Sequence, residues 1–362
     1  MTVIEVAKKI SQLNGRLFLV GGAVRDSFMN REIHDRDFVV TGISVPDFKK
    51  AFNDPPMTGN SFPVFRLEID NEECEVAFAR REKKVSEGHN GFDMDFSPII
   101  SIEEDLIRRD ITINAIARDI LTNEIIDPFH GIQDIQNHLI SAVSHHFVED
   151  PLRVLRVARQ AAVFNFHVDK RTLNLMEACK SELSTLPFSR IWKELEKALL
   201  SDNPSIFFQV LKDSNTLHDI FPELIDVPII KGNTLESRFC SIFINTNSNI
   251  IKNWDTERFP KKLKKAALAL SEVIKRPLST EQDILKVFSI LHRHCDIDTF
   301  ITVAEPPQII SEALFNEVFK SISVPKTILS KDVPEIKNFI NQIRLERISN
   351  FIRKEDNHVL LE

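Results

Sequence analysis

The chain has 362 residues, 43% of them hydrophobic and 27% charged, and carries a formal net charge of −7. This length and composition are typical of a globular protein with two or more domains. The acidic balance excludes a protein whose whole surface attracts nucleic acid, so any contact with RNA must come from local basic patches.

The N-terminal residues MTVIEVAKKISQLNG predict a polar amphipathic helix and lack the apolar stretch of a signal peptide. No apolar run approaches the roughly 18 residues of a membrane span. The four cysteines are widely spaced in sequence and form no CxxC pair, as expected of thiols in a reducing compartment. We therefore predict a cytoplasmic protein with no membrane and no DNA partner.

Residues 1–145 alternate short strand-like runs with turns. Strands are predicted at 16–20, 37–41, 73–79 and 138–143, with a hairpin at 118–127. Residues 82–98 are polar and include Gly88 and Gly91, which predicts a mobile loop.

After about residue 148 the pattern changes to helices. Helices are predicted at 151–164, 170–183 and 189–199, and helical patterning continues to the C-terminus, with a less regular candidate linker at 226–255. The sequence thus predicts an α+β fold in three parts: a head at 1–145, a helical neck at 146–225, and a helical body and tail at 226–362.

The first chemical signature is the run LVGGAVRD, in which a predicted strand leads through Gly21 and Gly22 into a helix. Glycines let a backbone approach a bulky anion, and a helix N-terminus offers free N–H donors. Arg25 would add a charge-assisted contact to a triphosphate. Alone, the pattern is also that of an ordinary tight turn.

The second signature is Asp35 and Asp37, at the start of the next predicted strand. Strand alternation would put both carboxylates on one face, and close carboxylates usually need a compensating cation, for which oxygen ligands favour Mg²⁺. Glu75 would join them if the third strand pairs alongside. Three carboxylates could hold two ions that activate a hydroxyl and neutralise a leaving pyrophosphate. In isolation, a solvated turn is an equal alternative.

Together, GGAVRD and the following DRD resemble the class II tRNA nucleotidyltransferases and bacterial poly(A) polymerases, of the polymerase β-type superfamily. The resemblance implies that Gly22 and Arg25 contact the nucleotide, and that Asp35 and Asp37 bind the metal. It also implies that Glu75, in EVAFAR, is the third catalytic carboxylate. The implied architecture is a nucleotidyltransferase head with a mixed sheet, followed by an all-α neck, body and tail.

A third run, RRDITINAIA, matches the family's RRDxTxNA motif. The resemblance assigns Arg109 to nucleotide binding. We expect Arg108 and Asp110 to hold the head against the next helix, and Asn114 to bond the ribose or a loop backbone. A generic Arg-Arg-Asp would be a surface ion pair of little energetic weight.

The most informative run is EDPLRVLRVAR, which meets the family's EDxxR motif with Glu149, Asp150 and Arg153. A carboxylate only accepts hydrogen bonds and a guanidinium only donates them. Cytosine and adenine each present an amino donor beside a ring-nitrogen acceptor, whereas uracil and guanine present the reverse. A fixed Asp150–Arg153 pair can therefore select C and A, with roughly 1–3 kcal/mol of discrimination per good pair.

Helical geometry puts Arg153, Arg156 and Arg159 on one face, opposite an apolar face, where they could serve base and triphosphate. The family's binding residues carry over as Asp150 and these three arginines. The local alternative is that Asp150, before Pro151, caps a helix. Capping and base selection need different oxygens and can coexist.

These signatures predict template-independent addition of CCA to the 3′ end of tRNA from CTP and ATP, with the 226–362 part binding tRNA. No suitable His-Asp pair follows the neck, so the chain resembles the form without an HD-type phosphohydrolase domain. The cluster His292–Asp296 has no second His/Cys group at zinc spacing and predicts a helix with mixed faces.

The alternatives differ in what they leave unexplained. A poly(A) polymerase is disfavoured by a short chain that is acidic overall. A partial enzyme that adds only CC is disfavoured by residues 82–98, which resemble the flexible loop that such relatives lack; A-only addition stays open. A non-catalytic tRNA-binding protein would not need Asp35, Asp37 and Glu75. A small-molecule nucleotidyltransferase would not explain EDPLR or the long helical part.

Overall fold

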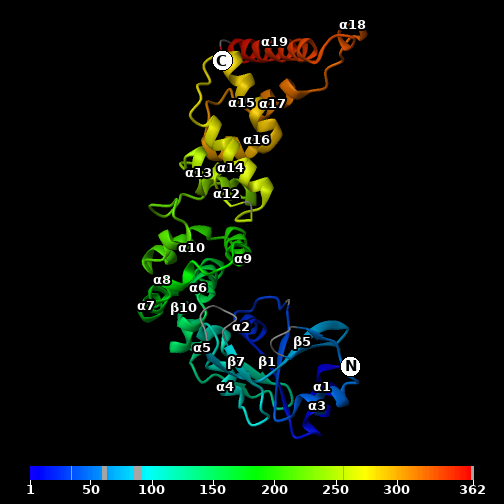
Figure 1. The fold of residues 1–362 in the computed structure, drawn as a ribbon, viewed down its shortest axis with the longest axis vertical. Helices are drawn as coiled ribbons and strands as arrows, with labels where there is room; N and C mark the ends of the chain where they lie inside the picture. The colour runs from blue at the N-terminus through cyan, green and yellow to red at the C-terminus, as the bar shows by residue number, and fades with distance from the viewer. Residues whose placement is uncertain (34, 59–62, 85–91, 256, 360–362) are drawn as a thin grey trace. The chain divides into compact units, whose positions relative to one another are not determined.

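The computed structural model describes residues 1–33, 35–58, 63–84, 92–255 and 257–359. It divides into two compact units, Met1–Pro222 and Glu223–Glu362 (Figure 1). The first unit holds a mixed sheet and helices, and the described part of the second unit is helical. This confirms the predicted α+β class. The division of the first unit into head and neck after residue 145 stays a prediction.

The described residues of the first unit form a seven-stranded sheet in the order β3-β4-β5-β2-β1-β8-β9. β2 and β5 run parallel, whereas the other neighbours in this sheet are antiparallel, so the sheet is mixed as predicted. The strands are β1 (Arg16–Val20), β2 (Asp37–Thr41), β3 (Met57–Thr58), β4 (Val64–Ile69), β5 (Glu72–Phe78), β8 (Ala117–Asp119) and β9 (Ile125–Ile126).

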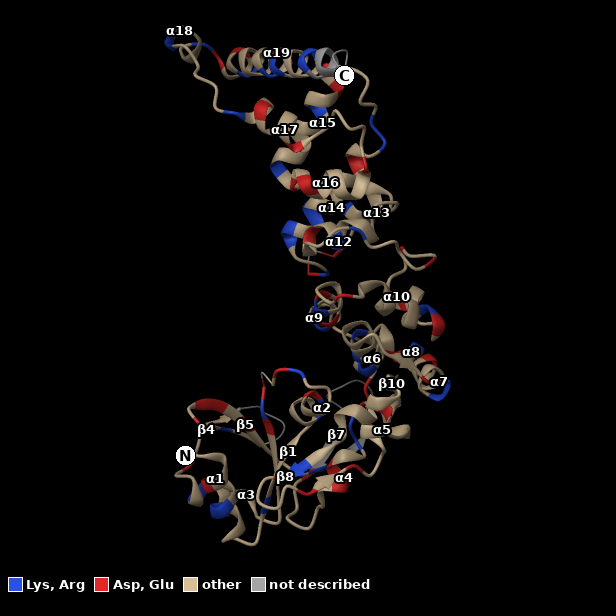
Figure 2. Ribbon diagram, turned by 180° about the vertical axis from the view of Figure 1, so that it is seen from behind, with Lys and Arg blue, Asp and Glu red and all other residues tan. Residues whose placement is uncertain are grey.

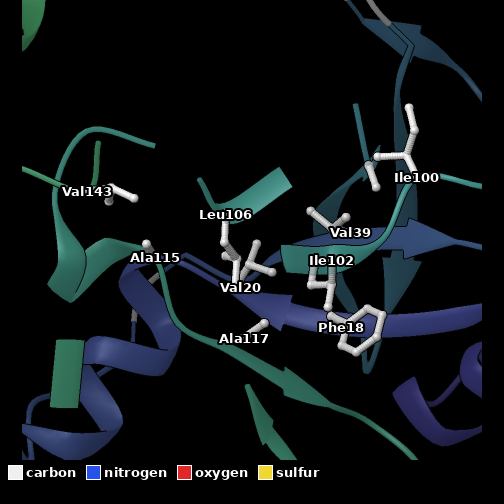
Figure 3. Packing of buried hydrophobic residues seen from close by; sticks show 10 residues of the cluster. Phe18, Val20, Val39, Ile100, Ile102, Leu106, Ala115, Ala117 and Val143 are labelled. Atoms are coloured by element: carbon white, nitrogen blue, oxygen red, sulfur yellow. The ribbon is translucent and has the colours of Figure 1, made fainter. Parts of the chain in front are cut away.

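Apolar side chains of the central strands form a hydrophobic core on one face of the sheet. Phe18 and Val20 of β1 pack with Val39 of β2 and with Leu106, each at most 3% exposed (Figure 3). Burying such a side chain contributes roughly 1.5–3 kcal/mol. β1 lies between β2 and β8 in the sheet. Because β1 is held by both neighbours and by this core, the turn that follows Val20 is held in place as well.

Helices cover the sheet, and further helices follow it in the chain and complete the first unit. Within the helical part, α6 packs against α9 and α10, with Leu155, Ala158 and Ala161 fully buried, and ends at Asn165 in a left-handed conformation. The helices are α1 (Val3–Ser11), α2 (Gly22–Phe28), α3 (Val45–Ala51), α4 (Ile102–Leu106), α5 (Gly131–Gln136), α6 (Leu152–Phe164), α7 (Lys170–Ala178), α8 (Lys180–Leu183), α9 (Phe188–Leu199), α10 (Pro204–Asp213) and α11 (Leu217–Ile220), with 3-10 turns η1 (Thr112–Asn114) and η2 (His145–Glu149).

The second unit is built on pairs of packed helices. α14 packs against α12 and α15, and α19 packs against α15 and α17. Among the described helices of the chain, none is both long and apolar enough to cross a membrane. The helices of this unit are α12 (Leu235–Ile242), α13 (Ser248–Lys252), α14 (Lys261–Val273), α15 (Glu281–His294), α16 (Ile297–Ala304), α17 (Glu312–Phe319), α18 (Lys326–Leu329) and α19 (Val333–Val359).

Three segments depart from the sequence predictions. The predicted loop at 82–98 contains parts of β6 (Arg81–Lys84) and β7 (Phe92–Asp95), which pair antiparallel, while residues 85–91 lie outside the described chain. The predicted strand at 138–143 shrinks to β10 (Leu139–Ile140), which pairs with β11 (His167–Val168) instead of the main sheet. A short two-stranded ribbon is held by backbone hydrogen bonds and needs no buried face. The alternation of apolar and polar residues therefore does not predict where such a ribbon lies. The candidate linker at 226–255 contains α12 and α13.

Candidate active site

A cavity of about 700 Å³ in the first unit gathers most of the residues predicted to bind a nucleotide. Eight arginine or lysine residues and five aspartates line it, so it is positively charged within an acidic chain. Such a concave, positive site fits a polyanionic ligand such as a triphosphate. The predicted residues that line it are Gly22, Arg25, Asp35, Asp37, Arg109, Asp150, Arg153, Arg156 and Arg159.

The turn between β1 and α2 depends on Gly21 more than on Gly22. Gly21 has φ 67° and ψ −130°, a conformation that residues with a side chain rarely adopt. A Cβ at Gly21 would lie 3.0 Å from Nη1 of Arg109, whereas one at Gly22 would lie 3.4 Å from Nη2 of Arg25. The motif predicts a role for Gly22, and the geometry adds Gly21, against whose backbone Arg109 packs.

Arg25 is held from three sides. Its Nε and Nη2 donate to the Asp26 carboxylate at 2.9 and 3.0 Å, and its Nη1 donates to Oδ1 of Asn114 at 2.5 Å. Its guanidinium also lies 4.5 Å from the centroid of the Phe164 ring. Asn114, expected to bond a ribose or a loop backbone, instead binds Arg25 and, through Nδ2, the Asp110 carboxylate at 3.3 Å. Arg25 is therefore preorganised at the cavity wall.

We call Asp35, Asp37 and Glu75 the carboxylate edge. β2 and β5 pair in parallel with Asp37 directly opposite Glu75, which confirms that the third predicted strand lies alongside the second. β2 begins at Asp37, so Asp35 precedes the strand and strand alternation does not place it. Asp35 and Asp37 line the cavity, and Glu75 is not among the lining residues.

The carboxylate edge is crowded by like charge. Burial of the Asp37 carboxyl raises its pKa; Arg109 opposes that shift, and Glu75 and Asp35 add to it, although the residue stays accessible to solvent. Within the described residues, none of the three side chains makes a hydrogen bond or ion pair, and no three acidic, His or Cys groups form a metal centre by themselves. Unpaired carboxylate oxygens that share one edge nevertheless fit a hard divalent cation, which would relieve their repulsion.

Asp105, in α4, anchors both arginines of the RRD run. Its carboxylate is 0% exposed and binds Arg108 at 2.6 Å and Arg109 at 3.2 Å. Burial by itself would raise the pKa of this carboxyl, but the two guanidinium groups hold it below its usual value. Asp105 thus stays ionised and fixes Arg109, whose Nη1 reaches the Asn114 carbonyl at 3.4 Å. Its i,i+3 and i,i+4 spacing from the two arginines was the only sequence signal for this role.

Asp110 ties the RRD segment to α6, as expected. Its Oδ2 accepts from Nε of Arg156 and pairs with Nη2 of the same residue, both at 2.8 Å. Burial disfavours the charge, but Arg156 and Arg153 hold the pKa of the Asp110 carboxyl well below its usual value. Arg108 contributes to the same tie through its backbone carbonyl, which accepts a hydrogen bond from Arg153.

Asp150 and Arg153 lie at the start of α6, and both line the cavity. Oδ1 of Asp150 accepts the Leu152 N–H at 3.0 Å, which is the capping bond foreseen as the local alternative, and Oδ2 makes no hydrogen bond to the described residues. Arg153 donates to the carbonyls of His146 and Arg108 at 2.5 and 2.6 Å. The two side chains do not bond each other in the described chain, but Oδ2 and further guanidinium N–H groups remain for a ligand.

We call Arg153, Arg156 and Arg159 the arginine row. Arg159 pairs with the buried carboxylate of Glu194 on α9, so every member of the row has a protein partner. Arg153 is itself buried, at 8% exposure, although the helical pattern placed it opposite the apolar face. The row is therefore anchored positive charge, with its geometry set before any ligand binds.

Some cavity residues carry no predicted role. Arg80, which ends the EVAFAR run just after β5, lines the cavity together with Gln160 of α6 and Lys197 of α9. Gln160 lies one turn after Arg156 and is 4% exposed, and its Oε1 has no hydrogen-bond partner among the described residues. The spacing of residues in the sequence does not predict that Lys197 or Arg80 lies at the site, because only the tertiary packing of separate elements places them there.

Comparison with known proteins finds two family models that match parts of this chain. Residues 17–141 match the family model of the Poly A polymerase head domain, and residues 165–227 match that of the probable RNA and SrmB-binding site of polymerase A. The Multifunctional CCA protein of Haemophilus ducreyi is 47% identical over 216 residues, covering 58% of this chain and 51% of that protein. The chain belongs to the tRNA nucleotidyltransferase/poly(A) polymerase family. Members of such nucleotidyltransferase families generally use divalent metal ions.

Other relatives extend the comparison. The CCA-adding enzyme of Actinobacillus succinogenes is 42% identical over 247 residues, covering 67% of this chain and 59% of that enzyme. The chain thus spans between 51% and 59% of the lengths of these two curated relatives. A CCA-adding enzyme in its apo form II has the same fold, with a TM-score of 0.69 at 20% identity over 98% of this chain and 94% of its own. The Bacillus stearothermophilus CCA-adding enzyme in complex with CTP gives 0.64 at 19% identity over 98% of both chains.

Proposed function

We propose that the protein adds cytidine and adenosine nucleotides to the 3′ end of tRNA, taking them from CTP and ATP without a template. One observation carries the proposal: a single positively charged cavity is lined by Asp35 and Asp37 at one wall and by Asp150 and Arg153 at another. Relatives named as a Multifunctional CCA protein and a CCA-adding enzyme support the same assignment.

In the proposed reaction the tRNA 3′-hydroxyl attacks the α-phosphate of the bound nucleotide, and pyrophosphate leaves. Asp35, Asp37 and Glu75 would hold the divalent metal, which we assign as Mg²⁺ because carboxylate and phosphate oxygens are its preferred ligands. When bound, the metal lowers the pKa of the attacking hydroxyl and neutralises the leaving group. Arg25 and Arg109, both fixed by carboxylate or amide partners, orient the triphosphate against the Gly21-Gly22 turn.

Base choice in this proposal belongs to Asp150 and Arg153. The free Oδ2 of Asp150 accepts the amino group of cytosine or adenine, and Arg153 donates to the neighbouring ring nitrogen. Uracil and guanine would set donor against donor and acceptor against acceptor, which costs roughly 1–3 kcal/mol per unmatched group in a site closed to water. Arg156 and Arg159, held by Asp110 and Glu194, add fixed positive charge for the phosphates.

The proposed activity on tRNA also favours a cytoplasmic location. All four cysteines are free, as thiols are in a reducing compartment.

The test is a product analysis with purified protein. A tRNA that ends before CCA and a tRNA that ends in CC are each offered CTP, ATP, UTP and GTP, singly and together, and the products are sequenced. The proposal expects CCA on the first substrate and a single A on the second. Long A tails would indicate a poly(A) polymerase, addition of only CC or only A a partial enzyme, and no extension a tRNA-binding protein.

A further inference from the structure

Arg36 separates Asp35 from Asp37 in the sequence, but it is not among the residues that line the cavity. Pairing of β2 with both of its neighbours begins at Asp37, which lies opposite Val20 of β1 and Glu75 of β5. The sheet therefore fixes Asp37 and Glu75, whereas Asp35 precedes the first paired residue. A contact outside the pairing of the strands has to hold Asp35 in place.

The side chain of Arg36 supplies such a contact, because it binds the hairpin between β4 and β5. Its Nη1 donates to Oδ2 of Asp70 at 2.8 Å, and its Nη2 donates to the Ile69 carbonyl and pairs with the Glu72 carboxylate, both at 2.9 Å. Only 22% of the Arg36 side chain is exposed. The ribbon of this hairpin is red with acidic residues in Figure 2. One guanidinium thus ties the segment before β2 to the start of β5.

The turn that accepts Arg36 is itself held in place. Asp70 and Asn71 form the two-residue turn of the hairpin, with φ of 54° and 67°, the positive values that a type I′ turn requires. Oδ1 of Asp70 also accepts the Val3 N–H at 3.2 Å, which joins the turn to the start of α1. The Arg36 guanidinium holds the pKa of the Asp70 carboxyl below its usual value, so this partner stays ionised.

We propose that Arg36 is a positioning residue for the metal site: by tying the segment before β2 to the β4–β5 hairpin, it holds Asp35 within reach of the other two members of the carboxylate edge. The inference deepens the proposed function and rests on it. Clustered carboxylates repel one another, so a flexible Asp35 would turn away from its neighbours until a cation arrived. With its backbone held at Arg36, Asp35 loses less freedom when the cation binds.

Charge and geometry make opposite predictions for the removal of Arg36. A guanidinium near the carboxylate edge repels a divalent cation, so the loss of its charge alone would tighten metal binding. The loss of its hydrogen bonds should instead weaken metal binding, by about tenfold, as is typical of residues that orient metal ligands. Arg36→Lys keeps the charge, but an ammonium group lacks the planar fork that serves several acceptors at once. A deficit in this variant therefore reports geometry alone.

The experiment measures binding of Mn²⁺ alone to the full chain, from the electron paramagnetic resonance signal of the free ion, without nucleotide or tRNA. Mn²⁺ takes the same oxygen ligands as Mg²⁺. The test variants are Arg36→Gln and Arg36→Lys, and Asp37→Ala shows which binding belongs to the carboxylate edge. The matched control is Arg16→Gln. Arg16 ties the start of β1 to Asp119 and Glu124 of the β8–β9 hairpin, both at 2.8 Å, at the end of β1 that does not pair with Asp37.

Both Arg36 variants should raise the Kd for Mn²⁺, Arg36→Gln by about tenfold, whereas Arg16→Gln should leave it unchanged. The Mg²⁺ concentration that gives half-maximal nucleotide incorporation should rise in the Arg36 variants as well. At saturating Mg²⁺ the KM for CTP should equal that of the wild type, because Arg36 does not line the cavity. The thermal midpoints of Arg36→Gln and Arg16→Gln should fall by similar small amounts, since each variant loses ion pairs at one end of a strand.

Unchanged or tighter Mn²⁺ binding by Arg36→Gln, or an equal loss in Arg16→Gln, would overturn the inference. If Asp37→Ala binds Mn²⁺ as the wild type does, the Mg²⁺ requirement of incorporation decides in its place, by the same comparison of variants. Because Mn²⁺ binding needs no catalysis, the two proposals can fail separately. A wild-type protein whose Mn²⁺ binding depends on Arg36 but which extends no tRNA would overturn the proposed function alone.

Discussion

The carboxylate edge and the arginine row belong to the same site but are built in opposite ways. The carboxylate edge is accessible to solvent, and its side chains have no hydrogen-bond or ion-pair partners in the described chain. Every member of the arginine row binds a carbonyl or a carboxylate of the protein. One wall is left in mutual repulsion, and the other is positive charge that protein partners hold in place.

This difference separates what the fold needs from what the chemistry needs. A fixed guanidinium loses little freedom when a phosphate or base arrives, so its ion pairs serve binding as well as folding. Clustered carboxylates without partners destabilise the fold, and they are useful only when a cation joins them. Changes at the carboxylate edge should therefore remove activity and spare stability, whereas changes at the partners of the arginine row should lower stability first.

The largest expected effect is at Asp37. Asp37→Ala should reduce nucleotide incorporation by at least about 1,000-fold, since metal ions supply several kcal/mol of transition-state stabilisation. Because the pKa of the Asp37 carboxyl is raised in the folded state, its charge at neutral pH disfavours folding, so the thermal midpoint should stay level or rise. Glu73→Ala, which removes an exposed carboxylate from the neighbouring strand β5, is the control. Full incorporation by Asp37→Ala would refute the catalytic role.

The converse is expected at Asp110. Asp110→Asn should lower the free energy of unfolding by about 3 kcal/mol, because it leaves the buried end of the Arg156 ion pair uncompensated. The folded-state pKa of this carboxyl is depressed, so its stabilisation is complete above its unfolded pKa, near 4, and is lost as the pH falls further. Urea unfolding at pH 7 and at pH 3 should show the gap between wild type and variant closing at the lower pH. An unchanged gap would contradict the assignment.

A smaller effect separates the two glycines of the β1–α2 turn. Gly21→Ala should cost about 1–3 kcal/mol of stability, because its φ of 67° is strained for alanine and the new Cβ presses on Arg109. The KM for CTP should rise with it. Gly22→Ala has ordinary φ and a looser contact, so its loss should be under about 1 kcal/mol. Equal losses in thermal unfolding and KM would show that Gly21 is not the residue that shapes the turn.

The smallest effect on overall rate is expected at Asp150. Asp150→Ala should reduce the preference for CTP and ATP over UTP and GTP about tenfold, within the 1–3 kcal/mol of one lost base contact. It should also lose about 1 kcal/mol of stability with its capping bond. Asp169→Ala is matched to this second effect alone, since Asp169 caps α7 through the Thr172 N–H at 2.6 Å, away from the cavity. Unchanged base preference in Asp150→Ala would refute base selection by this residue.

The sequence predicts best those elements whose buried residues follow one another in the chain. β1 and β2 begin and end where predicted, because their runs of buried apolar residues are bounded by turn residues. The residues 152–164 of α6 follow from the Asp150-Pro151 start and the apolar stripe. Motif residues from four distant runs do line one cavity, as the family resemblance implies.

What sequence missed depends on contacts between distant segments. Asp105 has no motif of its own, and its importance comes from two arginines that follow it by one helical turn. Glu194 lies on α9, and only packing of that helix against α6 brings it to Arg159. Gly21 differs from Gly22 in its backbone torsions, which identical residue types cannot reveal. The positive charge of the arginine row could therefore be predicted from the sequence, but the protein partners of these arginines could not.

The cross-links between Asp110 and α6 and between α6 and α9 have a consequence for how such genes can recombine. They join residues from Asp105 to Glu194 into one electrostatic block, although predicted head and neck meet inside it. A hybrid with its crossover inside this block would pair guanidinium groups from one parent with the carboxylates or carbonyls of another. Viable chimaeras between family members should therefore exchange this stretch whole, and breakpoints should cluster before α4 or after α9.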